Sequence, residues 1–317
     1  MRNAFVRSLL HAAAENPRVL LVTGDLGFGV LDEFRARYPS QFYNVGVAEQ
    51  NLAGVAAGLA LSGHVVVTYS IGNFPTIRCL EQVRNDICYH QADVKIVTVG
   101  GGMAYGALGI SHFATEDLAI LRSLPGMTVV APGDPVEVEQ LVPQIVAHPG
   151  PVYLRLGRAG EERLHQSGTE VRLGSPTRAR QGSEVLLLTA GGMLPVALEA
   201  AEMLDRDGTS VEVHSVHTVK PLDAAAICKL ASRFPIVVTC EEHTCLGGLG
   251  GAVAEVLLEG GIQPVFRRFA LPSAFPTGVG SQEFLRRVNG LDANALRGLV
   301  LSLTGARRSQ HFLSPRG

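Results

Sequence analysis

Short runs of apolar, mostly β-branched residues alternate along this chain with longer segments of helical periodicity. The runs that predict strands are Val19–Thr23, His64–Tyr69, Lys95–Val99, Met127–Ala131 and Val152–Leu156, followed later in the chain by Glu184–Thr189, Val211–Ser215, Pro235–Cys240 and Val265–Ala270. Apolar strands separated by helices are typical of a parallel sheet covered on both faces. The sequence therefore predicts an α/β fold in which mostly parallel sheets are flanked by helices.

The alternation is interrupted between Arg158 and Gly182, where glycine, serine, proline and charged residues prevail. Such a polar, irregular stretch is typical of a linker. We therefore predict two domains, residues 1–160 and residues 183–317, joined by a linker over residues 161–182. A length of 317 residues agrees with two domains of ordinary size.

The composition argues against several classes of protein. Basic and acidic residues number 27 and 29 without a long basic run, so we expect no nucleic-acid binding. No apolar stretch is long enough to span a membrane, so we expect no membrane association. The five cysteines form no CxxC pair, which indicates reduced thiols and a cytoplasmic protein. Cys240, His243 and Cys245 lack a suitably spaced fourth ligand, so no metal site is predicted in this chain.

The common nucleotide-binding and hydrolase motifs are also absent. The sequence contains no P-loop, no dinucleotide-type GxGxxG, no HExxH and no GxSxG. Glycine-rich stretches at residues 100–102 and 247–251 could cradle a phosphate, but such stretches are more typical of tight turns.

The most informative segment is Asn44–Asn51, NVGVAEQN, which follows a strand-like run and opens an Ala- and Gly-rich helix. Its one charged residue is Glu49, at the start of that helix. A carboxylate in the first turn can simply favour the positive end of the helix dipole. The residues alone leave open whether Glu49 is structural or functional.

This segment resembles the corresponding motif of transketolases and, more broadly, of thiamine-diphosphate enzymes. The similarity continues through Phe74–Asn85, through the stretch from His112 to Asp134, and through Val219–Asp223, and it covers nearly the whole chain. The GDG motif that holds Mg²⁺ and the cofactor diphosphate in this family is absent. The resemblance therefore implies the C-terminal subunit of a split transketolase, with a pyrimidine-binding domain and a transketolase C-terminal domain.

The resemblance implies thiamine diphosphate as the cofactor, with Mg²⁺ or Ca²⁺ held by a separate N-terminal subunit that carries the GDG motif. It implies that Glu49 is the catalytic carboxylate that shares a proton with N1′ of the pyrimidine, and that Phe74 stacks on this ring. Ile71 and Ile77 stand where the family usually has aromatic residues, and Asp25 matches a residue near the cofactor. A core phenylalanine and a turn aspartate are the structural alternatives for Phe74 and Asp25.

For the substrate, the resemblance implies that Arg2, Arg158 and His112 contact a sugar phosphate, with His112 also catalytic. Arg78 matches an arginine of some relatives, including deoxyxylulose-phosphate synthases, and is likewise predicted to contact the substrate. Surface charges and helix ion pairs are the structural alternatives for these residues. The chain also departs from the family pattern, with Leu108 replacing an acidic residue, Gly100 a histidine and Gly29 a serine. These changes predict an altered sugar or aldehyde specificity.

Three functions remain open at this point. The leading one is a thiamine-dependent transferase, active only with its partner subunit, that moves a two-carbon ketol unit from a ketose phosphate to an aldehyde. The second is a β-type subunit of a 2-oxo acid decarboxylating or deoxyxylulose-phosphate-synthase-like enzyme. The third is a non-catalytic regulatory homologue. The shared active site of the family implies an α2β2 heterotetramer.

Overall fold

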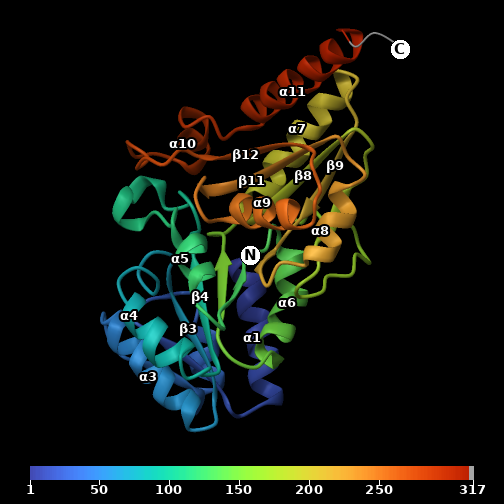
Figure 1. The fold of residues 1–317 in the computed structure, drawn as a ribbon. Helices are drawn as coiled ribbons and strands as arrows, with labels where there is room; N and C mark the ends of the chain where they lie inside the picture. Colours follow the sequence, from blue (N-terminus) through green and yellow to red (C-terminus); the bar gives the residue numbers. More distant parts are fainter. Residues whose placement is uncertain (314–317) are drawn as a thin grey trace.

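The computed structural model describes residues 1–313, with side chains for residues 1–307. The chain forms two sheets, each with helices on both faces, and the N-terminus lies near the junction between the two halves (Figure 1). The predicted class, two mostly parallel sheets flanked by helices, is confirmed. The predicted second domain extends to residue 317, and its last residues, 314–317, lie outside the described residues.

The first sheet has seven strands in the order β10-β5-β6-β4-β3-β1-β2. Its strands are β1 (Val19–Thr23), β2 (Phe42–Asn44), β3 (Val65–Ile71), β4 (Val94–Val99), β5 (Thr128–Val130), β6 (Val152–Leu156) and β10 (Thr218–Lys220). All pair in parallel except β10, which pairs antiparallel with β5.

Because side chains alternate along each strand, the two faces of this sheet build separate cores. One face packs under α1 (Arg2–Glu15) and α6 (Pro135–Ala147), and the other under α3 (Glu49–Leu61) and α5 (Asp117–Ser123). The short helices α2 (Asp32–Arg37) and α4 (Leu80–Gln82) lie in the connections before β2 and β4.

The second sheet has five strands in the order β12-β11-β8-β9-β7. Its strands are β7 (Thr177–Arg180), β8 (Val185–Ala190), β9 (Val211–Ser215), β11 (Ile236–Thr244) and β12 (Val265–Leu271). The helices of this half are α7 (Leu194–Arg206), α8 (Ala224–Ala231), α9 (Leu249–Glu259), α10 (Gln282–Val288) and α11 (Ala293–Leu313). α7 and α11 pack on one face, and α8 and α9 on the other (Figure 1).

Two connections tie the halves together. β10 follows the second sheet's β9 in the chain but adds to the edge of the first sheet. One hydrophobic core also runs through both halves, from Leu121 and Val129 of the first to Leu186 and Val237 of the second.

Two details were not predicted from the sequence. The predicted linker over residues 161–182 contains the strand β7, which pairs with β9. Its polar sequence, with one buried residue of four, suits an edge strand and gives no apolar pattern. Between β3 and β4 the chain forms α4 followed by a π-helical segment, Val83–Cys88. None of the helices within residues 1–313 is both long and apolar enough to span a membrane.

Candidate active site

The loops that carry the predicted site residues leave the first sheet at one end, where its parallel strands have their carboxyl termini. Parallel pairing sends the carboxyl ends of β1, β2, β3, β4 and β6 to the same side. The loops after these strands hold, in this order, Asp25, Glu49, Phe74, His112 and Arg158. From β1 the chain continues to β2 on one side, and from β3 it continues to β4 on the opposite side. The strand order therefore reverses between β1 and β3. Ligands of open α/β sheets bind in the crevice at such a point.

Glu49 begins α3, and its side chain is only 2% exposed. A buried carboxylate is costly unless it is paired. Its partner is Arg78, whose guanidinium nitrogen donates a hydrogen bond of 2.8 Å to Oε2. The Arg78 side chain is 48% exposed, so a solvent-accessible cation neutralises a buried anion.

A row of rings and guanidinium groups continues from this ion pair. The guanidinium carbon of Arg78 lies 4.3 Å from the centroid of the Phe74 ring. The rings of Phe74 and His112 meet edge-on at 5.1 Å, and the rings of His112 and Tyr105 are 6.4 Å apart. Arg158 lies over Tyr105, with its guanidinium carbon 5.4 Å from the ring centroid. The structure thus brings together Glu49 and four other predicted site residues.

His112 is positioned by its neighbours in a short 3₁₀ turn, Ile110–His112. Its Nδ1 lies 3.0 Å from the hydroxyl of Ser111. The carbonyl of Ser111 in turn accepts a hydrogen bond of 2.8 Å from the Asn73 amide, which comes from the loop that carries Phe74. The two loops are therefore tied to each other beside Phe74.

Arg2 approaches the same row from α1. Its Nε is buried and has no hydrogen-bond partner within the described part of the chain. Burial raises the pKa of Tyr105, and the positive charges of Arg158 and Arg2 oppose this shift, so both guanidinium groups act on one ring. A buried, unsatisfied donor beside a second arginine suits an anionic ligand.

Of the other predicted cofactor residues, Asp25 follows β1, Ile71 ends β3, and Ile77 precedes Arg78 in the chain. Asp25 is exposed, has a φ of 58°, and exchanges hydrogen bonds of 2.9 Å with the Asn44 side chain. The same Asn44 oxygen accepts the N–H of Gly46, so Asp25 supports the loop that leads to Glu49. Ile71 is half-buried at the end of β3, and Ile77 is exposed.

Tyr105 is the site residue that the sequence analysis missed, and it explains one departure from the family pattern. Gly100 has a φ of 84°, and a Cβ added there would lie 2.2 Å from the Tyr105 ring. The tyrosine therefore occupies the space that a histidine at position 100 would need. The signal in the sequence was an aromatic residue just after residues 100–102 in a chain with 6% aromatics. Of the other departures, Leu108 is exposed and Gly29 faces open space.

The glycines at residues 247–251 do not form an open phosphate cradle. The Glu241 carboxylate accepts the N–H groups of Leu249 and Gly250 at 2.7 and 2.8 Å, so it occupies the N-terminus of α9. Within the described residues, no group of three or more His, Cys, Asp or Glu side chains is arranged to hold a metal ion.

A cavity of about 610 Å³ lies at the junction of the two halves, beside Arg158. Neither Glu49 nor Phe74 lines it, and ion pairs such as Arg286 with Glu242 already fill part of its wall. We place the site at Glu49 because the predicted residues converge there. Side chains around it reach solvent, Arg78, Ile77 and Leu108 among them, so we call this carboxyl-terminal end of the sheet the open edge.

Two family models match the chain. Residues 1–160 match the transketolase pyrimidine binding domain, and residues 174–296 match the transketolase C-terminal domain. A solved structure described as a split gene transketolase, in an inactive β4 tetramer, is 35% identical, with a TM-score of 0.85. The match covers 95% of this chain and 96% of that chain.

Curated relatives are also found. A 6-deoxy-6-sulfo-D-fructose transketolase subunit from Clostridium sp. (strain MSTE9) is 37% identical over 93% of this chain and 92% of its own length. A subunit of an apulose-4-phosphate transketolase from Phocaeicola vulgatus is 38% identical over 81% of this chain and 83% of its own length. A 1-deoxy-D-xylulose-5-phosphate synthase from Chlorobium phaeovibrioides is 34% identical over 93% of this chain but only 47% of its own length.

Proposed function

The chain belongs to the transketolase family, and from this membership we propose that it is the C-terminal subunit of a two-polypeptide transketolase. The enzyme would transfer a two-carbon ketol unit from a ketose phosphate to an aldehyde. The observation that carries the proposal is Glu49, a buried carboxylate beside the aromatic face of Phe74 at an open edge of the sheet. Relatives named as transketolase subunits match over most of both chains.

The transketolase family depends on thiamine diphosphate, which supplies a nucleophilic carbon for the group transfer when it is bound. The residues present fit its aminopyrimidine ring. Glu49 would share one proton with N1′, donating it to the neutral ring or accepting a hydrogen bond from the protonated ring, because its carboxylate is buried and has only one partner within residues 1–307. Phe74 would contact the ring face, with Ile71, Ile77 and Asp25 at the margin.

A partner subunit would hold the diphosphate and its Mg²⁺ or Ca²⁺, since this chain lacks the GDG motif. The open edge supports such a partner. Large apolar side chains are exposed on the loops around it, at Val47, Ile77, Leu108 and Ile110. Exposed apolar groups around a half-built site are typical of a surface that another chain covers. We propose an α2β2 assembly, because a shared site of this kind is repeated by twofold symmetry.

The substrate would carry an anionic end held by Arg2 and Arg158, with His112 beside the reacting sugar oxygens. The unsatisfied Nε of Arg2 supports this assignment. Leu108 cannot accept a hydrogen bond, so recognition of a donor hydroxyl would differ from that of ordinary transketolases. The names of two relatives, which refer to a sulfonated ketose and to apulose-4-phosphate, agree with unusual sugars that carry an anionic group.

We propose the same domain division as from the sequence, 1–160 and 183–317 with the connecting segment 161–182, and a cytoplasmic enzyme. A second candidate is a deoxyxylulose-phosphate-synthase-like reaction, favoured by Arg78. Product analysis with a ketose phosphate and with pyruvate separates the two reactions. A non-catalytic role is disfavoured, because a scaffold has no need for a buried Glu49 at this edge.

The test is Glu49→Gln in the complex reconstituted with the partner subunit. We expect turnover to fall by roughly 10²–10⁴-fold, the usual contribution of a positioned acid-base group. Glu202→Gln, at an exposed position on α7, is the matched control and should turn over normally. Near-normal turnover of Glu49→Gln would remove the assignment of Glu49.

A further inference from the structure

We propose that Arg78 holds the place of the pyrimidine ring in the subunit without coenzyme and is displaced when the coenzyme binds. In this interpretation Arg78 is a positioning residue for Glu49 and not a contact for the substrate's anionic end. The inference rests on the proposed function of the site.

The geometry carries the first step. The proposed function gives the coenzyme ring two contacts on this chain, a hydrogen bond to Glu49 and the face of Phe74. Arg78 makes both contacts itself, with a nitrogen 2.8 Å from the Glu49 carboxylate and its guanidinium carbon 4.3 Å from the Phe74 centroid. A guanidinium group is planar and donates N–H groups in its plane, as a protonated aminopyrimidine does. The two groups therefore compete for one place.

The burial of Glu49 explains why a substitute is needed. Its side chain is 2% exposed, and Arg78 is its one hydrogen-bonding partner within residues 1–307. Without Arg78 the free subunit would hold a buried, unpaired carboxylate, which is strongly unfavourable. The ion pair thus keeps the Glu49 carboxylate paired and oriented until the coenzyme arrives.

The surroundings of Arg78 explain how it can leave. Its side chain is 48% exposed, so the guanidinium can move into water without losing a buried position. The next residue, Cys79, is buried and donates a weak hydrogen bond from Sγ to the Phe74 carbonyl at 3.7 Å. The backbone beneath Arg78 is therefore anchored, while its head group borders on solvent.

A site that is closed most of the time binds its ligand less tightly, in proportion to the open fraction. Arg78→Met should therefore tighten coenzyme binding by the reconstituted complex, by about tenfold if the site is open one-tenth of the time. The same variant should lower the thermal stability of the isolated subunit, because Glu49 loses its partner. Glu49→Gln in the Arg78→Met background should restore much of that stability.

The experiment measures the coenzyme dissociation constant of the complex and the melting temperature of the isolated subunit. The variants are Arg78→Met, Arg78→Lys and the double variant, and the control is Arg84→Met at a nearby exposed position. Arg78→Lys should return both quantities toward the wild type. If Arg78→Met fails to fold, Arg78→Gln replaces it.

Weaker or unchanged coenzyme binding by Arg78→Met would overturn the inference, because displacement requires tighter binding. Absence of coupling between positions 49 and 78 in stability would also overturn it. Failure of the proposed function is distinguishable: it would appear as normal turnover of Glu49→Gln, whatever Arg78→Met does.

Discussion

Glu49 at the open edge and Glu137 at the junction of the two halves are both buried glutamates, but their surroundings differ. Glu49 has one partner, Arg78, whose head group reaches solvent. The Oε2 atom of Glu137 accepts the N–H of Gly133 at 2.7 Å and the hydroxyl of Ser215 at 3.0 Å. Its Oε1 lies 3.6 Å from Nε2 of His165, and both side chains are fully buried.

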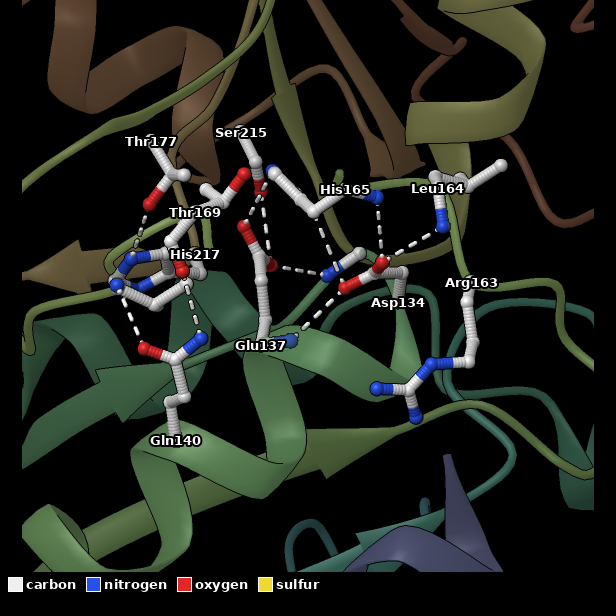
Figure 2. A network of polar contacts seen from close by, with 12 residues as sticks. Asp134, Glu137, Gln140, Arg163, Leu164, His165, Thr169, Thr177, Ser215 and His217 are labelled. Atoms are coloured by element: carbon white, nitrogen blue, oxygen red, sulfur yellow. Dashed lines mark hydrogen bonds and ion pairs between the residues drawn. The ribbon is translucent and has the colours of Figure 1, made fainter. Parts of the chain in front are cut away.

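Glu137 belongs to a larger cluster, the junction network, formed by Asp134, Glu137, His165 and Ser215 (Figure 2). Asp134 caps α6 by accepting the N–H of Glu137 at 2.9 Å. Its other oxygen accepts the N–H of His165 at 3.0 Å, and the His165 ring lies 3.2 Å from the carboxylate. Side chains from α6, from the segment after β6 and from β9 therefore meet in one sealed cluster (Figure 2).

The comparison separates two uses of a buried carboxylate. In the junction network the partners are themselves fixed in the core, so the carboxylate fastens three segments together. At the open edge the single partner can leave, so the carboxylate is available to a ligand. We infer that the mobility of the partner, more than the burial of the acid, distinguishes a ligand site from a structural one.

The largest difference is expected in stability. Glu137→Ala should lower the free energy of unfolding by about 3–5 kcal/mol, because it removes the acceptor of the Gly133 N–H and the Ser215 hydroxyl and the carboxylate beside the buried His165. Glu49→Ala should cost the isolated subunit about 1 kcal/mol or less, because Arg78 then turns to water. Urea unfolding of both variants measures this. Equal losses of unfolding free energy would show that the two glutamates do not differ in their structural roles.

The pH dependence of the free energy of unfolding should also arise from the junction network. Burial raises the pKa of Glu137 to about 7 despite the nearby charge of His165 and the N–H of Gly133. Burial opposes protonation of His165, but its contacts with Asp134 and Glu137 outweigh burial and raise its pKa. A group whose pKa is raised in the folded state contributes stability that is fully present below its unfolded-state pKa. This contribution is lost as the pH rises through the folded-state pKa.

The wild type should therefore lose stability between pH 5 and pH 8, by up to about 3 kcal/mol from Glu137. Asp134 acts at the other end: burial opposes its ionisation, but its contacts with His165 and the Glu137 N–H lower its pKa to about 2. Its contribution is lost only as the pH falls from about 4 through about 2. Denaturant unfolding at several pH values measures both windows. In Glu137→Gln the loss of stability between pH 5 and pH 8 should be smaller. An unchanged pH dependence of the unfolding free energy would contradict its assignment to Glu137.

A smaller effect is expected at the aromatic face of the open edge. Phe74→Leu should weaken coenzyme binding by about 0.5–1.5 kcal/mol, or roughly twofold to tenfold, because a branched aliphatic side chain lacks the stacking contribution. Coenzyme titration of the reconstituted complex provides the measurement. Phe284→Leu, at an exposed position on α10, is the control and should bind normally. Unchanged binding by Phe74→Leu would mean that the ring does not contact the coenzyme.

The smallest effect concerns specificity. Leu108→Asp restores a hydrogen-bond acceptor, so it should raise kcat/KM for donors with the corresponding hydroxyl by about twofold to tenfold relative to donors without it. Competition between two such donors measures the ratio directly. An unaltered ratio would show that Leu108 lies away from the substrate.

Much of the open edge could be predicted, because it depends on local features. The strand β1 has the predicted bounds, and the helix α3 begins at Glu49, as predicted. Once the strands are parallel, the residues after them must gather at one edge, and the family resemblance indicated which of them to examine. Tyr105 was missed because only the three-dimensional packing brings its ring over Gly100.

The junction network could not be predicted in this way. Glu137, His165 and Ser215 are far apart in the sequence, and each is polar in a segment whose pattern says nothing of burial. The short strands β7 and β10 were missed for a related reason. Pairing with a neighbour in the fold, and not their own composition, makes these residues strands.

The position of β10 limits how this polypeptide can be divided. A fragment that ends at residue 160 would keep the proposed pyrimidine-binding residues but would leave the edge of β5 bare. Uncovered strand edges recruit other chains, so we expect such a fragment to aggregate. The boundary that is easiest to see in the sequence is therefore a poor place to cut the protein.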